Sequence, residues 1–367
     1  MTFMKKFWQV ALKSLFIVTL WWVLLGVFVG YITTKYGVSP TFPYYQQVRK
    51  QANIQSSVWA HFDGVHYLKL AETGYVDEGT QAFFPVYPLL IKILSSTGLS
   101  YFAASRLISY LCLVGSIICI YYLFESRRIQ IISALLLFPT SFYLASTYTE
   151  SLFLLETLLF FILLKYKKFF PAAIVAGIAS GTRLVGGALA LSLMIELFKI
   201  RRLHKYLLFF LLLSLSGLIG YMYFLWRQFG DPLAFMHVQS MFGAGRSGSE
   251  VILLPQVFYR YLKILWTAPA LSLLYGRSVL ELGLFIIFGY LIWIIRHKLT
   301  WPILIFLIIS ITLPTLSGTL SSMPRYLLIL VPFIISAIES KNFSIHLISG
   351  LLMLYLLSTF ATGQFVS

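Results

Sequence analysis

The chain contains three aspartates among 367 residues, and one of them, Asp63, lies in the segment WAHFDGVHYLKLAETGY at positions 59–75. Apolar residues spaced along this segment predict a short amphipathic helix after Asp63. On such a helix Asp63, His66 and Tyr67 share one face, because residues three and four apart are neighbours. This carboxylate is placed to accept a proton from an acceptor substrate. The position equally suits an acid that only favours the helix dipole, and the spacing alone leaves both interpretations open.

The histidines around Asp63 suggest a second chemistry, metal binding. His61 and His66, together with Asp63 and Glu72, offer four ligand side chains. The two histidines are five residues apart, however, which is away from the best alignment on a helix. The set also lacks a known ligand spacing, such as two histidines four apart around a glutamate. We therefore expect these histidines to hydrogen-bond substrate or loop backbone, and predict no metal site.

Arg183 stands in the apolar stretch 169–199, within GIASGTRLVGG. A charge at membrane depth costs at least about 2.5–3.5 kcal/mol, so it should face a cavity or a partner. The neighbouring glycines allow close backbone approach, as a broken helix in a cavity wall requires. Arginine grips phosphate with two hydrogen bonds at once, which favours a site for a lipid phosphate. The alternative is a structural ion pair with Glu150, Glu156 or Glu196.

Three further polar residues stand at the ends of apolar runs. Glu150 follows STYT at the predicted start of a helix, where the dipole favours an acid. Asp231 in FGDPLAF and Arg325 in SMPRY each adjoin a proline, which marks a turn. Alone, these are ordinary span boundaries. The sequence has no Walker loop, no G-x-S-x-G and no dinucleotide fingerprint, so ATP-driven transport and serine-hydrolase chemistry have no support.

The composition determines which elements can position these residues. Hydrophobic residues make up 59% of the chain and charged residues 11%, against roughly 45–50% and about 25% in soluble domains. So apolar a chain cannot hide its surface in water. A membrane span needs roughly 20 apolar residues. The predicted fold class is therefore an all-α polytopic membrane protein, a single domain over 1–367 with about ten transmembrane helices.

The apolar runs place the expected spans along the chain. Spans are predicted at about 1–32, 101–124, 129–147, 149–166, 203–226, 278–296, 300–316, 325–340 and 343–362. The stretch 169–199 is expected as a re-entrant hairpin or two short broken helices, because basic clusters flank it on both sides.

The basic residues predict an orientation. The net charge is +16, and the lysines and arginines cluster at the ends of apolar runs, as in cytoplasmic loops. This pattern indicates membrane topology rather than nucleic-acid binding. With the N-terminus inside, the loop 33–82 that carries Asp63 lies outside, as does a second large segment, 227–277. STYTE and SGTLSSMPR are also expected outside, ESKN inside, and AFFPVYPLL at the interface.

The succession WAHFDGVHYLKLAETGY and AFFPVYPLL resembles the PIG-V family of glycosylphosphatidylinositol mannosyltransferases and its prokaryotic relatives. These belong to the GT-C superfamily of polyprenyl-phosphate-sugar-dependent glycosyltransferases. The resemblance continues in FPTSFYLASTYTESLF, GIASGTRLVGGAL, FGDPLAF with the following His237 and Gln239, and SMPRYLLILVPF. The stretches keep the family's order from Trp59 to Phe333, which is far more specific than any one of them.

The resemblance implies a GT-C-type fold with a large first outer loop that carries amphipathic helices. It implies transfer of a sugar, mannose in that family, from a polyprenyl-phosphate donor to an acceptor hydroxyl at the outer face, with inversion. The family's catalytic base is an acid in the first outer loop, and the matching position here is Asp63. The residues then expected to bind substrate are His66, Glu150, Arg183, Asp231 and Arg325.

Specific roles follow for several of these residues. Arg183 and Arg325 would stabilise the departing lipid phosphate. His66 would donate an auxiliary hydrogen bond, and Glu150 would position the acceptor or the sugar hydroxyls. No cofactor or divalent metal is expected, because the polyprenyl phosphate leaves as an anion and the lipid-linked sugar is a co-substrate.

The partners implied are the polyprenyl-phosphate sugar donor, a glycolipid or glycan acceptor, membrane lipids and a small membrane partner subunit, with no nucleic acid. The expected location is a prokaryotic plasma membrane, with the active site facing outside. The main rival is a flippase or secondary transporter, which would place acids and broken helices in pairs within repeated halves. A structural subunit for a catalytic partner is a third possibility.

Overall fold

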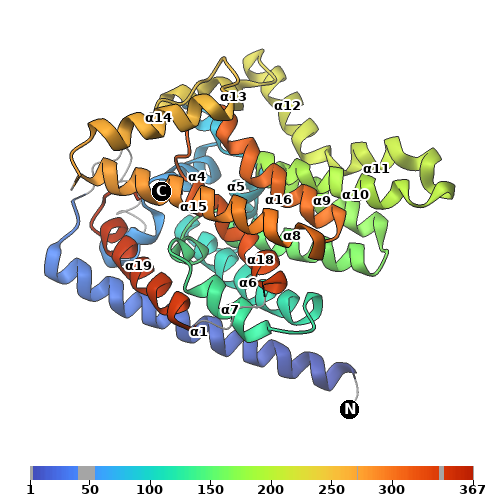
Figure 1. The fold of residues 1–367 in the computed structure, drawn as a ribbon, viewed down its shortest axis with the longest axis horizontal. Coiled ribbons are helices and arrows are strands. Elements are labelled where there is room, and N and C mark those ends of the chain that lie inside the picture. Colours follow the sequence, from blue (N-terminus) through green and yellow to red (C-terminus); the bar gives the residue numbers. More distant parts are fainter. Residues whose placement is uncertain (1–2, 40–53, 271, 339–342, 367) are drawn as a thin grey trace. The chain divides into compact units, whose positions relative to one another are not determined.

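The regular structure is helical throughout the residues that the structure describes. The computed structural model describes residues 3–39, 54–270, 272–338 and 343–366, and no strand occurs in these ranges. Figure 1 shows the helices in chain order. The predicted all-α class is confirmed.

The chain divides into two compact units. Unit 1 comprises residues up to Gly74, residues Pro85–Lys168 and the segment from Glu339 to Val366. Unit 2 comprises Tyr75–Phe84 and Phe169–Ile338. Each unit is described separately below, and the expected single domain stays a prediction.

Unit 1 contains one long helix, α1 (Phe3–Tyr36), which contacts α6 and α19 (Figure 1). Its other elements are α3 (Ile54–Ser57), η1 (Val58–Ala60), α4 (Asp63–Thr73), α5 (Val86–Ser95), α6 (Tyr101–Leu123), α7 (Arg128–Leu136), η3 (Ser141–Ala145), α8 (Glu150–Lys165) and α19 (Phe343–Ala361).

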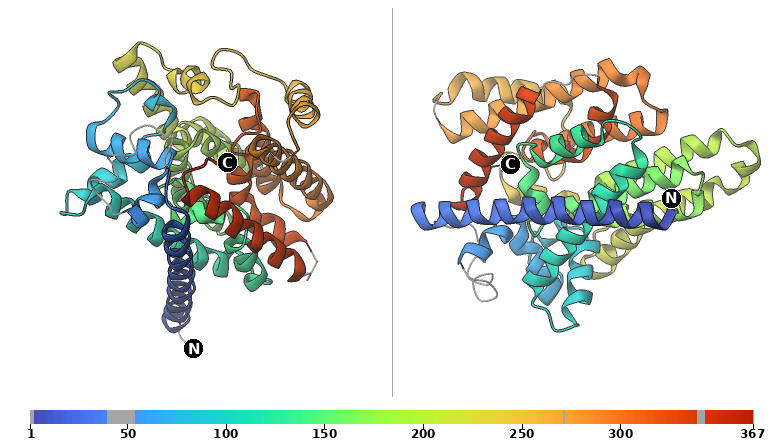
Figure 2. Two further views of the ribbon diagram at one scale, coloured as in Figure 1. Left: turned by 90° about the vertical axis from the view of Figure 1, so that its left-hand side faces the viewer. Right: turned by 90° about the horizontal axis from the view of Figure 1, so that it is seen from below.

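Unit 2 contains a group of short apolar helices, of which α9, α10 and α11 run side by side (Figure 2). Its elements are η2 (Thr80–Ala82), α9 (Phe169–Thr182), η4 (Leu184–Gly186), α10 (Gly187–Phe198), η5 (Arg201–Tyr206), α11 (Leu207–Ser214), α12 (Ser216–Phe229), α13 (Ala234–His237), η6 (Val238–Phe242), α14 (Leu254–Thr267), α15 (Leu273–Ile295), η7 (Arg296–Lys298), α16 (Trp301–Thr312), η8 (Leu313–Ser317), α17 (Met323–Leu327), η9 (Leu328–Leu330) and α18 (Val331–Ala337).

Within the described ranges, three helices are long and apolar enough to cross a membrane: Met4–Tyr36, Tyr101–Leu123 and Leu273–Lys298. A fourth is possible if Arg201–Ser214 and Ser216–Phe229, bent by 53°, form one span. The fold is thus compatible with a membrane protein. The ten expected spans are not confirmed, because most of the other apolar runs form shorter helices.

The expected span 129–147 shows why the apolar runs overestimate the spans. The helix α7 ends at Leu136, shortly before Pro139, and the chain continues as the 3₁₀ turn η3. Proline supplies no amide hydrogen and disfavours helix in the residue before it. The segment is deeply buried although it is not one helix. The apolar character of residues 129–147 therefore indicates a buried segment and not one continuous transmembrane helix.

The expected break in 169–199 is present. Helix α9 ends at Thr182, Arg183 is extended with φ −153°, and α10 begins at Gly187. A side chain at Gly186 would collide with the backbone of Ala179. A glycine is therefore required for the two helices to approach this closely.

The surface of α1 supports a membrane location. Large apolar side chains are exposed along much of its length, with Val23, Leu24 and Val27 all more than half exposed. A contiguous apolar surface of this kind is unfavourable in water. In a bilayer the same side chains would contact lipid tails.

Candidate functional site

Asp63 is the first residue of α4, as the sequence predicts. The residue before it, Phe62, has a positive φ of 55°, a conformation that costs about 1–3 kcal/mol for a side chain of this kind. The ring of Phe62 packs on Phe360 and Phe365 with centroids 5.7 and 5.3 Å away. These contacts hold the turn in place and fix the direction in which α4 starts. His66 follows Asp63 one turn later, and both are half-buried.

His61 has a structural position. Its side chain is fully buried, and its Nδ1 lies 3.0 Å from the carbonyl oxygen of Phe360. The hydroxyl of Tyr148 donates to the carbonyl of His61 over 2.8 Å. Burial lowers the pKa of His61 to about 4, although the Phe360 bond opposes this effect. His61 is therefore neutral at pH 7, and it hydrogen-bonds a backbone carbonyl in the last turn of α19 rather than the loop backbone expected from the sequence.

The segment that carries Glu150 is bonded to the segment that carries Asp63. The amide of Thr147 donates to the carbonyl of Trp59 over 2.7 Å. A side chain at Gly64 would lie only 3.2 Å from the Thr147 carbonyl, so the backbones are in close contact. The structure thus places Asp63, His66 and Glu150 in unit 1, at two adjoining helix starts.

Glu150 is not at an exposed span boundary. The whole segment STYTE is buried, and the Glu150 side chain is 1% exposed at the start of α8. Its placement at a helix N-terminus favours a negative charge. Trp59 is also buried, with 6% of its surface exposed.

In unit 2, Arg183 and Arg325 lie over the same aromatic ring. Their guanidinium carbons are 4.7 and 5.9 Å from the ring centroid of Tyr326. Arg325 is buried within α17 and is not on an exposed outer loop, which corrects the sequence expectation. Pro324 lies in the first turn of that helix, which suits proline because a backbone amide there has no partner within the helix. Two positively charged side chains of unit 2 therefore lie near one aromatic ring.

One of the three acids that could form an ion pair with Arg183, Glu196, is paired with another residue. Glu196 lies 2.5 Å from Lys199 on the same helix and forms its ion pair there. The pairing of Arg183 with Glu150 or Glu156 stays a prediction. The remaining support for Arg183 as an anion-binding group is its place at the break between α9 and α10.

Asp231 shapes a loop of unit 2. Its Oδ1 accepts from the amide of Leu233 over 2.9 Å, and its Oδ2 lies 2.7 Å from His237 Nδ1. Desolvation opposes ionisation, but the hydrogen bonds of His237 and Leu233 lower the pKa of Asp231 below its usual value. Both side chains are exposed. These contacts show a turn-forming role, and substrate binding by Asp231 stays a prediction.

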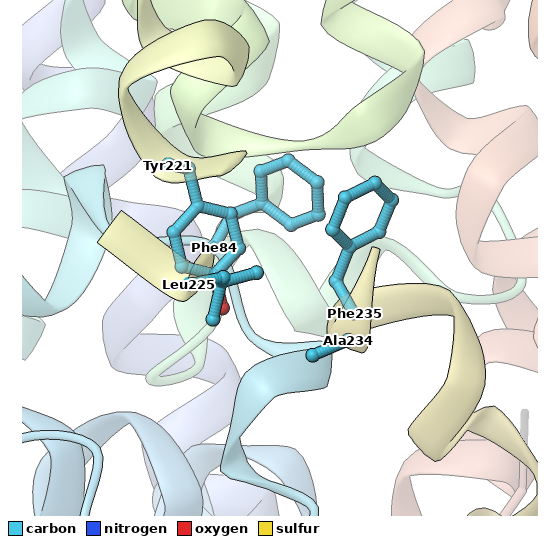
Figure 3. Packing of buried hydrophobic residues seen from close by; sticks show 5 residues of the cluster. All are labelled: Phe84, Tyr221, Leu225, Ala234 and Phe235. Carbon is cyan, nitrogen blue, oxygen red and sulfur yellow. The ribbon is translucent and has the colours of Figure 1, made fainter. Parts of the chain in front are cut away.

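The turn at Asp231 is anchored by an aromatic cluster (Figure 3). Phe84, from AFFPVYPLL, packs against Tyr221 and Phe235 with centroids 5.1 and 5.4 Å away. The Tyr221 hydroxyl donates to the carbonyl of Gln81 over 2.7 Å. The residues 81–84 are therefore packed against α12 and α13 within unit 2, and the position of AFFPVYPLL at the membrane interface stays a prediction.

The sequence analysis missed Glu281, a buried carboxylate on α15. Its side chain is 2% exposed, and one oxygen accepts from the Tyr261 hydroxyl over 2.5 Å. The same hydroxyl accepts from the amide of Leu320 over 3.0 Å. Tyr261 thus links Glu281 to the buried loop that precedes Arg325. The available signal was an acid inside an apolar run, which marks a functional candidate by itself.

The sequence analysis also missed Arg106, on α6. Its guanidinium carbon lies 4.1 Å from the ring centroid of Trp22 and 4.6 Å from that of Trp59. Arg106 is the only basic residue in the run 101–124, and its isolation was the missed signal.

Among the described residues no group of three or more histidine, cysteine, aspartate or glutamate side chains is arranged to hold a metal ion.

Comparison with known proteins adds no family. Models of protein families, curated proteins and solved structures give no match to this chain. The resemblance to PIG-V mannosyltransferases therefore depends on the sequence stretches alone.

Proposed function

We propose that this protein is an integral membrane glycosyltransferase. It moves a sugar from a polyprenyl-phosphate donor to an acceptor hydroxyl, with Asp63 as general base. The sugar is mannose and the fold is of the GT-C type if the resemblance to the PIG-V family is correct. The reaction faces the outside of a prokaryotic plasma membrane in this proposal.

The observation that carries the proposal is the construction of the turn before Asp63. Phe62 is held in a strained conformation by two aromatic contacts, and α4 begins immediately afterwards. Strain that the surrounding packing maintains is typical of functional sites. The adjoining Thr147 segment places a second acid, Glu150, at a neighbouring helix start. Two carboxylates at neighbouring, hydrogen-bonded helix starts suit a base and a group that positions hydroxyls.

The proposed reaction has a simple balance of bonds. The acceptor oxygen forms a bond to the anomeric carbon while its proton passes to the Asp63 carboxylate. The bond between that carbon and the phosphate oxygen breaks, and the lipid phosphate leaves with the electron pair. Attack opposite the leaving group inverts the anomeric configuration.

The remaining residues have supporting roles in the proposal. Arg183 and Arg325 bind the phosphate as its charge develops. His66 donates an auxiliary hydrogen bond, and Glu150 orients the sugar or acceptor hydroxyls. The proximity of both arginines to Tyr326 supports a joint role, since the ring keeps the two charges in one region of unit 2.

The test separates transfer from transport. Proteoliposomes containing the full chain receive polyprenyl-phosphate-mannose with labelled sugar, together with a glycolipid and glycan extract. The proposal predicts label in a new product, in addition to released polyprenyl phosphate. Labelled donor that crosses the bilayer chemically unchanged would support a flippase instead and contradict the proposal.

A further inference from the structure

Arg106 has no role in the proposed mechanism, and two tryptophan rings surround its charged group. It lies in the second turn of α6, about 8 Å along the helix from its first residue. Trp22 of α1 and Trp59 of η1 both stack against its guanidinium. All three residues belong to unit 1.

Two hydrogen-bond donors are left over at this contact. Nη1 of Arg106 and Nε1 of Trp22 are both buried, and neither meets an acceptor among the described residues. Buried donors are nearly always paired, and an unpaired one is unfavourable. The indole nitrogen and the guanidinium can only donate. The described part of the chain therefore supplies no acceptor for these two donors, and a negatively charged acceptor would also balance the arginine.

The two tryptophans preorganise the arginine for such a ligand. Stacking on aromatic rings fixes the plane of the guanidinium and leaves its edge for hydrogen bonds. A planar edge of this kind binds phosphate oxygens through two parallel hydrogen bonds. The nearby indole adds a third donor from α1.

The position of the site favours a lipid as the source of the phosphate. The helices α1 and α6 are two of the three long enough to cross a membrane. Next to Trp22, the side chains of Val23 and Leu24 are more than half exposed. A hydrocarbon chain can therefore lie along the exposed apolar face of α1, next to the residue Trp22 that contacts Arg106.

We infer that Arg106, Trp22 and Trp59 form a binding site for the phosphate group of a membrane lipid. Arg106 supplies the charge and the planar edge, Trp22 supplies a second donor and one stacking face, and Trp59 supplies the other face. The site adjoins the catalytic segment of the proposed function, since Trp59 is four residues before Asp63.

The test measures lipid binding without sugar or acceptor. Native mass spectrometry of the detergent-solubilised full chain is titrated with polyprenyl phosphate, phosphatidylglycerol and phosphatidylcholine, and inorganic phosphate is added as a competitor. Arg106→Gln is expected to weaken binding of the preferred lipid by about tenfold to a hundredfold, as for loss of a charged hydrogen-bond partner. Trp22→Phe keeps the stacked ring and removes Nε1, and should weaken binding by about fivefold.

Arg128, another arginine of unit 1, provides a matched control. Arg128 also lies near an aromatic ring, that of Tyr121, but its Nε donates to the carbonyl of Phe124. Arg128→Gln should leave lipid binding within about twofold of the unmodified protein. Melting curves in lipid-free detergent show whether each variant is folded.

The outcomes separate the sources of phosphate. If Arg106→Gln weakens the binding of polyprenyl phosphate alone, the site binds the donor lipid. If it weakens the binding of phosphatidylglycerol as well, the site is a general phospholipid site. Unchanged lipid affinity in a folded Arg106→Gln variant would overturn the inference, as would displacement of lipid by an equal concentration of inorganic phosphate. If Arg106→Gln does not fold, unchanged affinity in Trp22→Phe overturns it. Binding that depends on Arg106 in a protein without transferase activity would keep this inference and remove the proposed function.

Discussion

The amide of Thr147 donates a 2.7 Å hydrogen bond to the carbonyl of Trp59, across 88 positions of sequence. This bond joins the approach to α4, which starts at Asp63, to the approach to α8, which starts at Glu150. The Tyr148 hydroxyl adds a second bond to the same region, at the carbonyl of His61. The two carboxylates are therefore held by one hydrogen-bonded structure.

The glycine at the break after Arg183 gives a first prediction. Gly186→Ala should destabilise the protein by at least about 1–3 kcal/mol, because the new methyl group would collide with the backbone of Ala179. The adjacent Gly187 is the control, since a methyl group there meets only Leu215, at 3.6 Å. Thermal unfolding in detergent compares the two. Equal melting temperatures would show that the close approach is not required.

Tyr261 gives a second prediction. Tyr261→Phe removes the hydrogen bond to the buried Glu281 and the acceptor for the Leu320 amide. The expected loss of stability is about 1–3 kcal/mol, because a buried carboxylate loses a donor. Tyr259→Phe, on the same helix but 69% exposed, should change stability by less than about 0.5 kcal/mol. Chemical denaturation of both variants measures the difference, and similar values would contradict the role of the pair.

The buried His61 predicts a pH dependence. Its pKa is about 4 in the folded protein and 6.5 when unfolded, so between these values the unfolded chain binds more protons. Stability is then unaffected by His61 above pH 6.5 and falls as the pH drops towards 4, by up to about 3 kcal/mol. His61→Asn retains a donor for the Phe360 carbonyl and should lose this part of the pH dependence. Exposed His204→Asn should retain it. Parallel melting profiles of all three proteins between pH 7 and pH 5 would refute the assignment.

Local signals in the sequence were sufficient for several features. The start of α4 at Asp63 follows from apolar spacing, and the break at Arg183 follows from its glycines and the flanking charges. Both depend on neighbours within a few positions. The glycine that confirms the break, Gly186, is also nearby in sequence, whereas the rings that pack on Phe62, those of Phe360 and Phe365, are distant in sequence.

Features formed by distant residues could not be predicted in this way. The pairing of Tyr261 with Glu281 and the stacking of Arg106 on Trp22 join separate helices. Burial of the segment around Glu150 depends on packing from several elements. The segment ESKN at 339–342, which was expected inside between two spans, lies outside the described residues. Apolar character alone did not separate a span from a short buried helix.

The proposed phosphate role of Arg183 gives a fourth prediction. Arg183→Met should raise the KM for the polyprenyl-phosphate donor by about tenfold to a hundredfold and leave the KM for the acceptor nearly unchanged. Exposed Arg227→Met, in the last turn of α12, is the control and should alter neither. Steady-state kinetics with each substrate varied in turn measures both constants. Equal losses for donor and acceptor would indicate a folding role for Arg183.

The most direct test of the account is the transfer rate of the Asp63→Asn variant. This change keeps the shape of the side chain and removes the base, so the transfer of labelled mannose should fall about 10²–10⁴-fold. Glu72→Gln, an exposed acid on the same helix, should retain a rate close to that of the unmodified protein. Near-normal transfer by a folded, normally expressed Asp63→Asn protein would contradict the central claim that Asp63 is the general base.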